Sequence, residues 1–120
     1  MATVTSISHL DHTQHTHATG LDWPRIAYLT LLSRAIDDLE ETELLKNREV
    51  LYQFSARGHD MAQVILATLL DNPSDAAAGY YRSRPFLLGL DLDLEDAIAG
   101  PMMRAGGMSD GRDIGVVFNL

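Results

Sequence analysis

Residues 80–84 read Tyr-Tyr-Arg-Ser-Arg and bring two phenols and two guanidiniums into one short stretch. They follow the small-residue run Ala-Ala-Ala-Gly at 76–79 in a chain that is acidic as a whole. Arginine presents a planar fork of donors that matches phosphate or carboxylate oxygens, and a tyrosine hydroxyl can complete such a shell. The stretch is therefore a candidate anion site, and a surface ion-pair turn is the alternative interpretation.

Two further groups of side chains have types that bind metals. Histidines at positions 9, 12, 15 and 17 could capture a divalent cation, but such sites need a rigid frame, so a floppy polar tail is the alternative. Asp91, Asp93, Glu95 and Asp96 lack the spacing and the glycine of a calcium loop, and helix capping explains two of them. We assign no metal-binding residues.

Composition limits the classes of partner. The net charge of -8, from 9 Lys and Arg against 17 Asp and Glu, disfavours nucleic acid and anionic membranes as partners, so any phosphate must be bound locally. Cysteine is absent, which excludes disulfides and thiolate metal sites. No run approaches the ~20 apolar residues of a membrane span, and the N-terminus lacks a signal-peptide pattern. We expect a cytoplasmic protein of one small domain.

A long amphipathic helix is expected over roughly residues 22–45. Asp22 is a suitable N-cap, Pro24 suits the first turn, and apolar residues recur at helical spacing from Tyr28 to Leu39. Three acids near the end of this segment, Glu40, Glu41 and Glu43, are interpreted as a solvated face.

Three shorter helices should follow. One spans about 59–71 after Gly58, should be largely buried, and carries His59 in its first turn, where it could hold an anion or satisfy the helix start. Another begins at Pro85, which places the Tyr-Arg stretch at a loop-to-helix junction. The last covers 94–99, with Asp93 as its cap.

The fold class that follows is mainly α, with three to four helices. We divide the chain into a disordered His- and Thr-rich tail (1–20), a helical segment (21–105), and a Gly-rich loop with a strand-like end (106–120). Residues 114–118 read as a strand that needs a sheet to pair with, so we expect a truncated domain from which most of the sheet is missing.

Taken in order, the motifs resemble those of thiamine-diphosphate-dependent 2-oxo acid dehydrogenases, the decarboxylating first components of the pyruvate and branched-chain complexes. The resemblance is to the N-terminal part of their alpha portion, most closely in forms that fuse alpha and beta portions. It covers residues 21–120, and three segments carry it: Gly-His-Asp-Met-Ala-Gln-Val at 58–64, Tyr-Tyr-Arg-Ser-Arg at 80–84, and Leu-Glu-Asp at 94–96 with the Gly-rich 106–113.

The resemblance implies an α/β cofactor-binding fold and oxidative decarboxylation of a 2-oxo acid, with acyl transfer to lipoyl groups. It implies that Tyr81 and Arg82 contact the diphosphate of thiamine diphosphate, with Tyr80 a weaker candidate. The implied partners are the remaining alpha and beta portions, the lipoyl-bearing acyltransferase component, and further copies in a homo-oligomer.

Departures from the family pattern limit what this chain should do alone. The family's magnesium motif, Gly-Asp-Gly followed by Asn, is missing, because Asp110-Gly111 has no preceding Gly and comes too early. The activating glutamate belongs to the beta portion. We assign no catalytic residue and expect the isolated chain to be inactive and to hold neither magnesium nor the cofactor tightly. The alternative function is a stand-alone helical module that self-associates or binds a partner protein.

Overall fold

A computed structural model describes residues 20–107 and 109–112 of the chain. Within these residues the fold is mainly α, which confirms the expected class at that level. The histidines at 9–17 and the predicted strand at 114–118 lie outside the described residues. The helical elements are α1 (Trp23–Leu39), the π-helical turn η1 (Glu40–Leu44), α2 (Asp60–Thr68), α3 (Arg84–Gly89) and α4 (Leu94–Ala99).

Helix α1 begins where its sequence indicates. The Asp22 carboxylate accepts a hydrogen bond of 3.0 Å from the Arg25 backbone N–H, and Pro24 lies in the first turn. Helical backbone then continues through η1 to Leu44, close to the expected end at 45. The turn η1 was not predicted; at its end the N–H of the C-cap residue Leu45 donates to the Glu40 carbonyl, five residues back.

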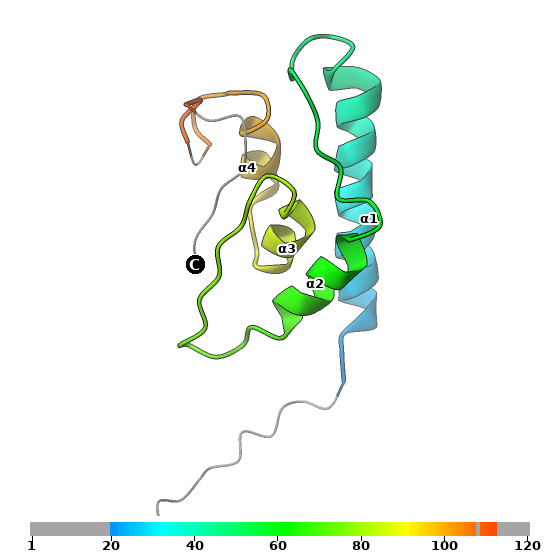
Figure 1. The fold of residues 1–120 in the computed structure, drawn as a ribbon, viewed down its shortest axis with the longest axis vertical. Helices are drawn as coiled ribbons and strands as arrows, with labels where there is room; N and C mark the ends of the chain where they lie inside the picture. Colours follow the sequence, from blue (N-terminus) through cyan, green and yellow to red (C-terminus); the bar gives the residue numbers. More distant parts are fainter. Residues whose placement is uncertain (1–19, 108, 113–120) are drawn as a thin grey trace, which may run out of the picture.

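The core forms where α1, α2 and α3 meet, as Figure 1 shows with α2 and α3 lying beside the long α1. Val64 of α2 and Leu87 of α3 are fully buried. The two helices approach closely because Gly89 faces Ala67, and a Cβ at Gly89 would lie 2.4 Å from the Ala67 Cβ. Glycine at this position is thus required by the packing of α3 on α2.

The prediction that the second helix is largely buried was wrong. Met61 and Leu66 of α2 are 47% and 51% exposed, because only the face carrying Asp60, Val64 and Ala67 packs against α1 and α3. None of the helices in the described part of the chain has the length and apolar character needed to cross a membrane.

Helix α4 lies above α3 in Figure 1 and farther than α3 from α1. Its start is capped as predicted, since the Asp93 carboxylate accepts a hydrogen bond of 2.7 Å from the Glu95 N–H. Ala97 is its buried contact with the core. The Gly-rich loop returns to this helix, because Gly107 approaches the Ala99 side chain.

Candidate anion site at the start of α3

The Tyr-Arg stretch forms a turn that leads directly into α3. The Ser83 N–H donates to the Tyr80 carbonyl at 2.7 Å, and the Leu87 N–H then donates to the Ser83 carbonyl at 2.9 Å. Gly79 brings the incoming loop onto α3, since a Cβ there would lie 2.3 Å from the Leu87 Cδ2. The predicted loop-to-helix junction is therefore present, and we call residues 80–84 the Tyr-Arg turn.

Four aromatic rings from two separate segments form a row beside this turn. The ring centroids of Phe54 and Tyr81 are 4.2 Å apart, and those of Tyr81 and Tyr80 are 4.0 Å apart. Tyr52 extends the row with an edge-on contact to Phe54 at 4.9 Å. Such contacts add to burial energy and fix the rings relative to each other. Tyr80 and Tyr81, two of the predicted cofactor contacts, therefore lie side by side.

Arg82, the third predicted contact, lies over this row. Its guanidinium carbon is 5.5 Å from the Phe54 ring centroid and 5.7 Å from that of Tyr81, which is the range of a cation–π contact. The Arg82 side chain is exposed, and it forms no ion pair or hydrogen bond with any residue that the structure describes. Its five N–H donors remain available to a ligand.

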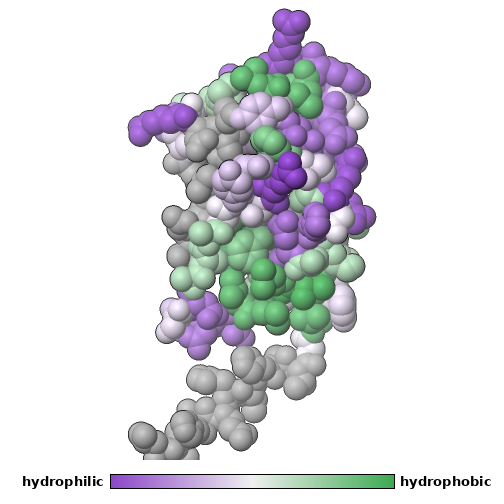
Figure 2. Space-filling view, in the orientation of Figure 1, coloured by the Kyte–Doolittle hydropathy of each residue, from purple (hydrophilic) through white to green (hydrophobic). Residues whose placement is uncertain are grey.

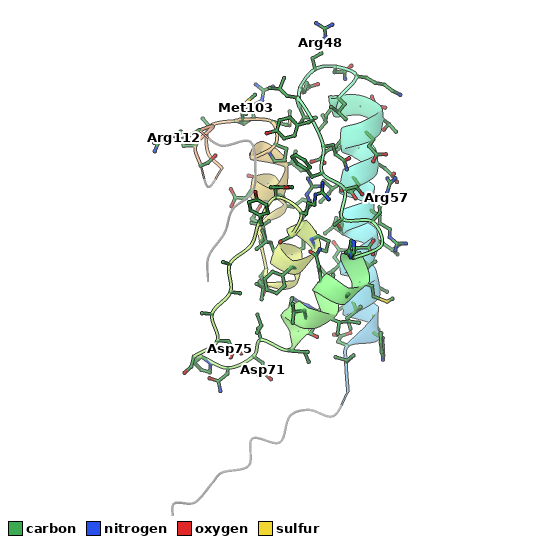
Figure 3. All side chains as sticks on the ribbon, viewed as in Figure 1. Arg48, Arg57, Asp71, Asp75, Met103 and Arg112 are labelled. Carbon is green, nitrogen blue, oxygen red and sulfur yellow. The ribbon has the colours of Figure 1, made fainter. Side chains whose placement is uncertain are left out.

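Most arginines in the described ranges are paired with carboxylates. The exceptions besides Arg82 are Arg48 and Arg112, for which no ion pair is present within those ranges, and Figure 3 shows Arg48 pointing away from the rest of the chain. Neither has an aromatic ring beneath it in the described part. The paired arginines are Arg25, Arg34, Arg57, Arg84 and Arg104.

Helix α2 braces the Tyr-Arg turn through one side chain. The Gln63 amide donates a hydrogen bond of 3.1 Å to the Arg82 backbone carbonyl. Its own carbonyl oxygen lies 3.4 Å from the Phe86 amide nitrogen. Gln63 belongs to the 58–64 motif, so two of the segments on which the family resemblance depends contact each other. The sequence pattern alone gives Gln63 no separate role.

Arg84, the second guanidinium of the turn, has a different environment from Arg82. It is buried, and its Nη1 donates to Asp37 of α1 at 3.1 Å while its Nη2 donates to the Glu40 carboxylate. The other Asp37 oxygen accepts from the Ser55 hydroxyl at 2.6 Å. Only one of the two guanidiniums is therefore presented to solvent.

The interpretation of the acids at 40–43 as a solvated face was wrong for Glu40. Glu40 is 2% exposed, and its burial raises the pKa of its carboxyl, an effect that Arg84 opposes. Its Oε2 atom has no hydrogen-bond partner among the described residues. Glu41 and Glu43 are exposed as predicted, and Glu41 lies 3.4 Å from Arg57.

A sequence signal for this buried network exists. Asp37 and Glu40 continue the spacing of the buried residues Ile26, Ser33 and Ile36, which places both acids on the core face of the helix. Two buried negative charges are costly unless a cation pairs with them, and Arg84 is that cation.

The other candidates in the described part of the chain do not join the site. His59 is exposed and makes no side-chain cap for α2. Asp91 pairs with Arg25 at 2.8 Å, and Asp93 caps α4. No group of three potential metal ligands occurs among the residues described.

Comparisons with known proteins add no assignment: no family profile, curated protein or solved structure matches the chain. The family resemblance is therefore carried by the motifs of this sequence alone.

Proposed function

We propose that the chain corresponds to the N-terminal part of the alpha portion of a thiamine-diphosphate-dependent 2-oxo acid dehydrogenase. In this proposal Arg82 and Tyr81 contact the diphosphate of the cofactor, and Tyr80 flanks them. The observation that carries the proposal is the state of Arg82, which is exposed, lies over Phe54 and Tyr81, and has no carboxylate partner in the described part of this acidic chain.

The residues present fit the diphosphate end of the cofactor. A free guanidinium forms charge-assisted hydrogen bonds with phosphate oxygens, and the rings beneath restrict its position before a ligand arrives. The contact between Gln63 and the Arg82 carbonyl holds the backbone of the turn against α2. When bound, thiamine diphosphate supplies the chemistry of 2-oxo acid decarboxylation, and the residues of this chain bind and orient it.

The same residues fit a magnesium ion poorly, because the described part of the chain contains no group of three potential metal ligands. Arg82 is then the main positive charge that this turn offers a diphosphate. We expect binding by the chain alone to be weak, on the order of millimolar, because one charge-assisted contact supplies only part of a tight site.

The test is an NMR titration of the 120-residue chain with pyrophosphate, thiamine diphosphate and thiamine. Both diphosphates should shift the signals of Arg82 and Tyr81, whereas thiamine, which lacks the phosphates, should leave them unchanged. Arg82→Gln should weaken the response about tenfold, the loss of one charge-assisted contact, while Arg48→Gln, a matched change at an exposed arginine, should not. Equal responses in the two variants would count against a site at Arg82.

Activity is tested in a chimera in which residues 21–112 replace the matching segment of a complete first component. We expect decarboxylation of a 2-oxo acid that is retained with Arg48→Gln and lost with Arg82→Gln. An assembled chimera without activity would contradict the assignment. For the chain alone, calorimetry with thiamine diphosphate and magnesium should show no tight one-to-one binding.

A second candidate function, self-association or partner binding by a helical module, is favoured by exposed apolar side chains. Tyr28 and Leu31 of α1 are both 63% exposed, and Leu69, at the end of α2, is 61% exposed. Figure 2 shows hydrophobic surface on the lower half of the described part, in the region of α2. Such surface commonly marks an interface. Sedimentation at several concentrations tests self-association, and a monomer at every concentration would count against self-association.

A further inference from the structure

Arg82 and Arg84 are two residues apart and serve different purposes in the turn. Arg82 is exposed and without a carboxylate partner in the described chain, whereas Arg84 is buried between Asp37 and Glu40. Because the separation is so short, the position of the Arg84 side chain constrains the backbone that carries Arg82. The buried arginine is thus a direct link between the candidate site and α1.

The contacts of Arg84 with α1 and η1 are buried, so the side chains that make them have little room to move. Asp37 and Glu40 lie on the core face of α1 and η1, and each is about 2% exposed. The two acids are three residues apart and therefore lie on the same face of the helix, where Arg84 bridges them with one nitrogen each. A lysine at position 84 has a single ammonium group and could not reproduce this planar double contact.

The charges of this network suggest that it fixes the relative positions of the elements that it joins. Two carboxylates and one guanidinium share a buried region, and one oxygen of Glu40 has no partner in the described chain. Buried ionic networks of this kind add little net stability compared with apolar residues of similar size. Their best-supported benefit is that they fix one arrangement of the elements they join.

We propose that Arg84 is a positioning residue for the anion site, which holds the Tyr-Arg turn so that Arg82 stays over Phe54 and Tyr81. The consequence for binding rests on the proposed function above. Arg84 and Gln63 hold the turn from two directions, one toward α1 and η1 and the other toward α2. The site therefore offers a diphosphate one guanidinium, that of Arg82, which is preorganised for binding.

The test uses the whole chain and a variant in which the network is removed without leaving a buried charge. Arg84→Met alone would strand two carboxylates and could unfold the protein. The triple variant Asp37→Asn, Glu40→Gln, Arg84→Met keeps similar volumes and removes all three charges. Val64→Ala serves as the control, because it weakens the core of α2 without touching the network.

Two readouts separate positioning from general stability. The first is the chemical shift of the Arg82 side-chain protons, which the Phe54 and Tyr81 rings move upfield when Arg82 lies over them. The second is the affinity for inorganic pyrophosphate under conditions where each variant is folded by circular dichroism. We expect the triple variant to lose the upfield shift and to bind about tenfold more weakly, the effect of one misplaced charge-assisted contact. Val64→Ala should change neither readout.

A folded triple variant with wild-type Arg82 shifts and wild-type affinity would overturn the proposal. If the triple variant does not fold, the variant Arg84→Lys tests the proposal instead. Changed chemical shifts of the Arg82 side-chain protons would support a positioning role for Arg84, and unchanged shifts would refute that role. The proposed function fails separately, because a wild-type chain that ignores pyrophosphate would refute the anion site. The Arg82 shifts would still report whether Arg84 positions the turn.

Discussion

Gln63 donates its side-chain amide to the backbone carbonyl of Arg82, across a separation of 19 residues in sequence and 3.1 Å in space. The same side chain faces the Phe86 N–H with its oxygen. Since an amide group has both a donor and an acceptor, glutamine can pair with two backbone groups at once, here one in the turn and one in α3. The Tyr-Arg turn is thereby attached to α2 as well as to its own helix.

Replacing Gln63 with alanine should loosen the turn. The variant loses one good hydrogen bond and one long contact, so we expect the free energy of unfolding to fall by about 1 kcal/mol. The Phe86 amide should also exchange with solvent faster. Urea unfolding and hydrogen exchange measure the two effects. Gln53→Ala is the matched control, because the buried Gln53 Nε2 has no partner in the described chain and its removal should cost less.

Gly89→Ala should destabilise the contact between α2 and α3. The new methyl group would lie 2.4 Å from the Ala67 Cβ, so the helices must separate, at a cost of about 1–3 kcal/mol that exceeds the gain in helix propensity. Thermal unfolding should show a lower Tm. Gly20→Ala, where nothing lies within 4 Å, should leave the Tm nearly unchanged.

A double-mutant cycle isolates the cause. Ala67→Gly removes the methyl group that Gly89→Ala would strike, so the two changes together should cost less than the sum of their separate effects. Strict additivity would show that the close approach of α2 and α3 is not what limits position 89.

Asp60 should contribute stability that depends on pH. The hydrogen bond from Arg34, at 2.5 Å, lowers the pKa of the Asp60 carboxyl below its ordinary value of 3.8. A lowered folded-state pKa gives stability that is full above pH 3.8 and is lost as the pH falls through the folded value. Asp60→Asn should therefore lower the stability at pH 7, by no more than about 1 kcal/mol because the partner Arg34 is half-exposed and screened by solvent, and the difference from wild type should shrink in strong acid. A difference that stays constant with pH would contradict this.

Much of the helical framework could be predicted from local signals. Asp22 and Asp93 both cap the helices that follow them, because a capping bond depends on only a few neighbouring residues. The α4 bounds of 94–99 also agree with the sequence analysis. The π-helical turn at Glu40–Leu44 left no comparable local signal, since it interrupts a segment whose spacing is otherwise α-helical.

The supports of the candidate site depend on contacts between distant segments, and these were not predicted. Phe54 meets Tyr81, and Glu40 meets Arg84 across 44 residues, so neither pairing can be inferred from spacing within one element. Burial of Glu40 was predictable in principle from its position on the core face. Its negative charge and its acidic neighbours instead favoured a solvated interpretation.

Glu40→Gln should leave the protein at least as stable as wild type at neutral pH. Burial raises the pKa of the Glu40 carboxyl above its ordinary value of 4.5, against the attraction of Arg84 and with repulsion from Asp37 and Glu41. Folding is thus favoured while Glu40 is protonated, and that benefit is lost as the pH rises through the folded pKa. The variant should match wild type below pH 4.5 and equal or exceed its Tm at pH 7. A Tm deficit that appears only at neutral pH would mean that pairing with Arg84 outweighs the cost of burying the charge.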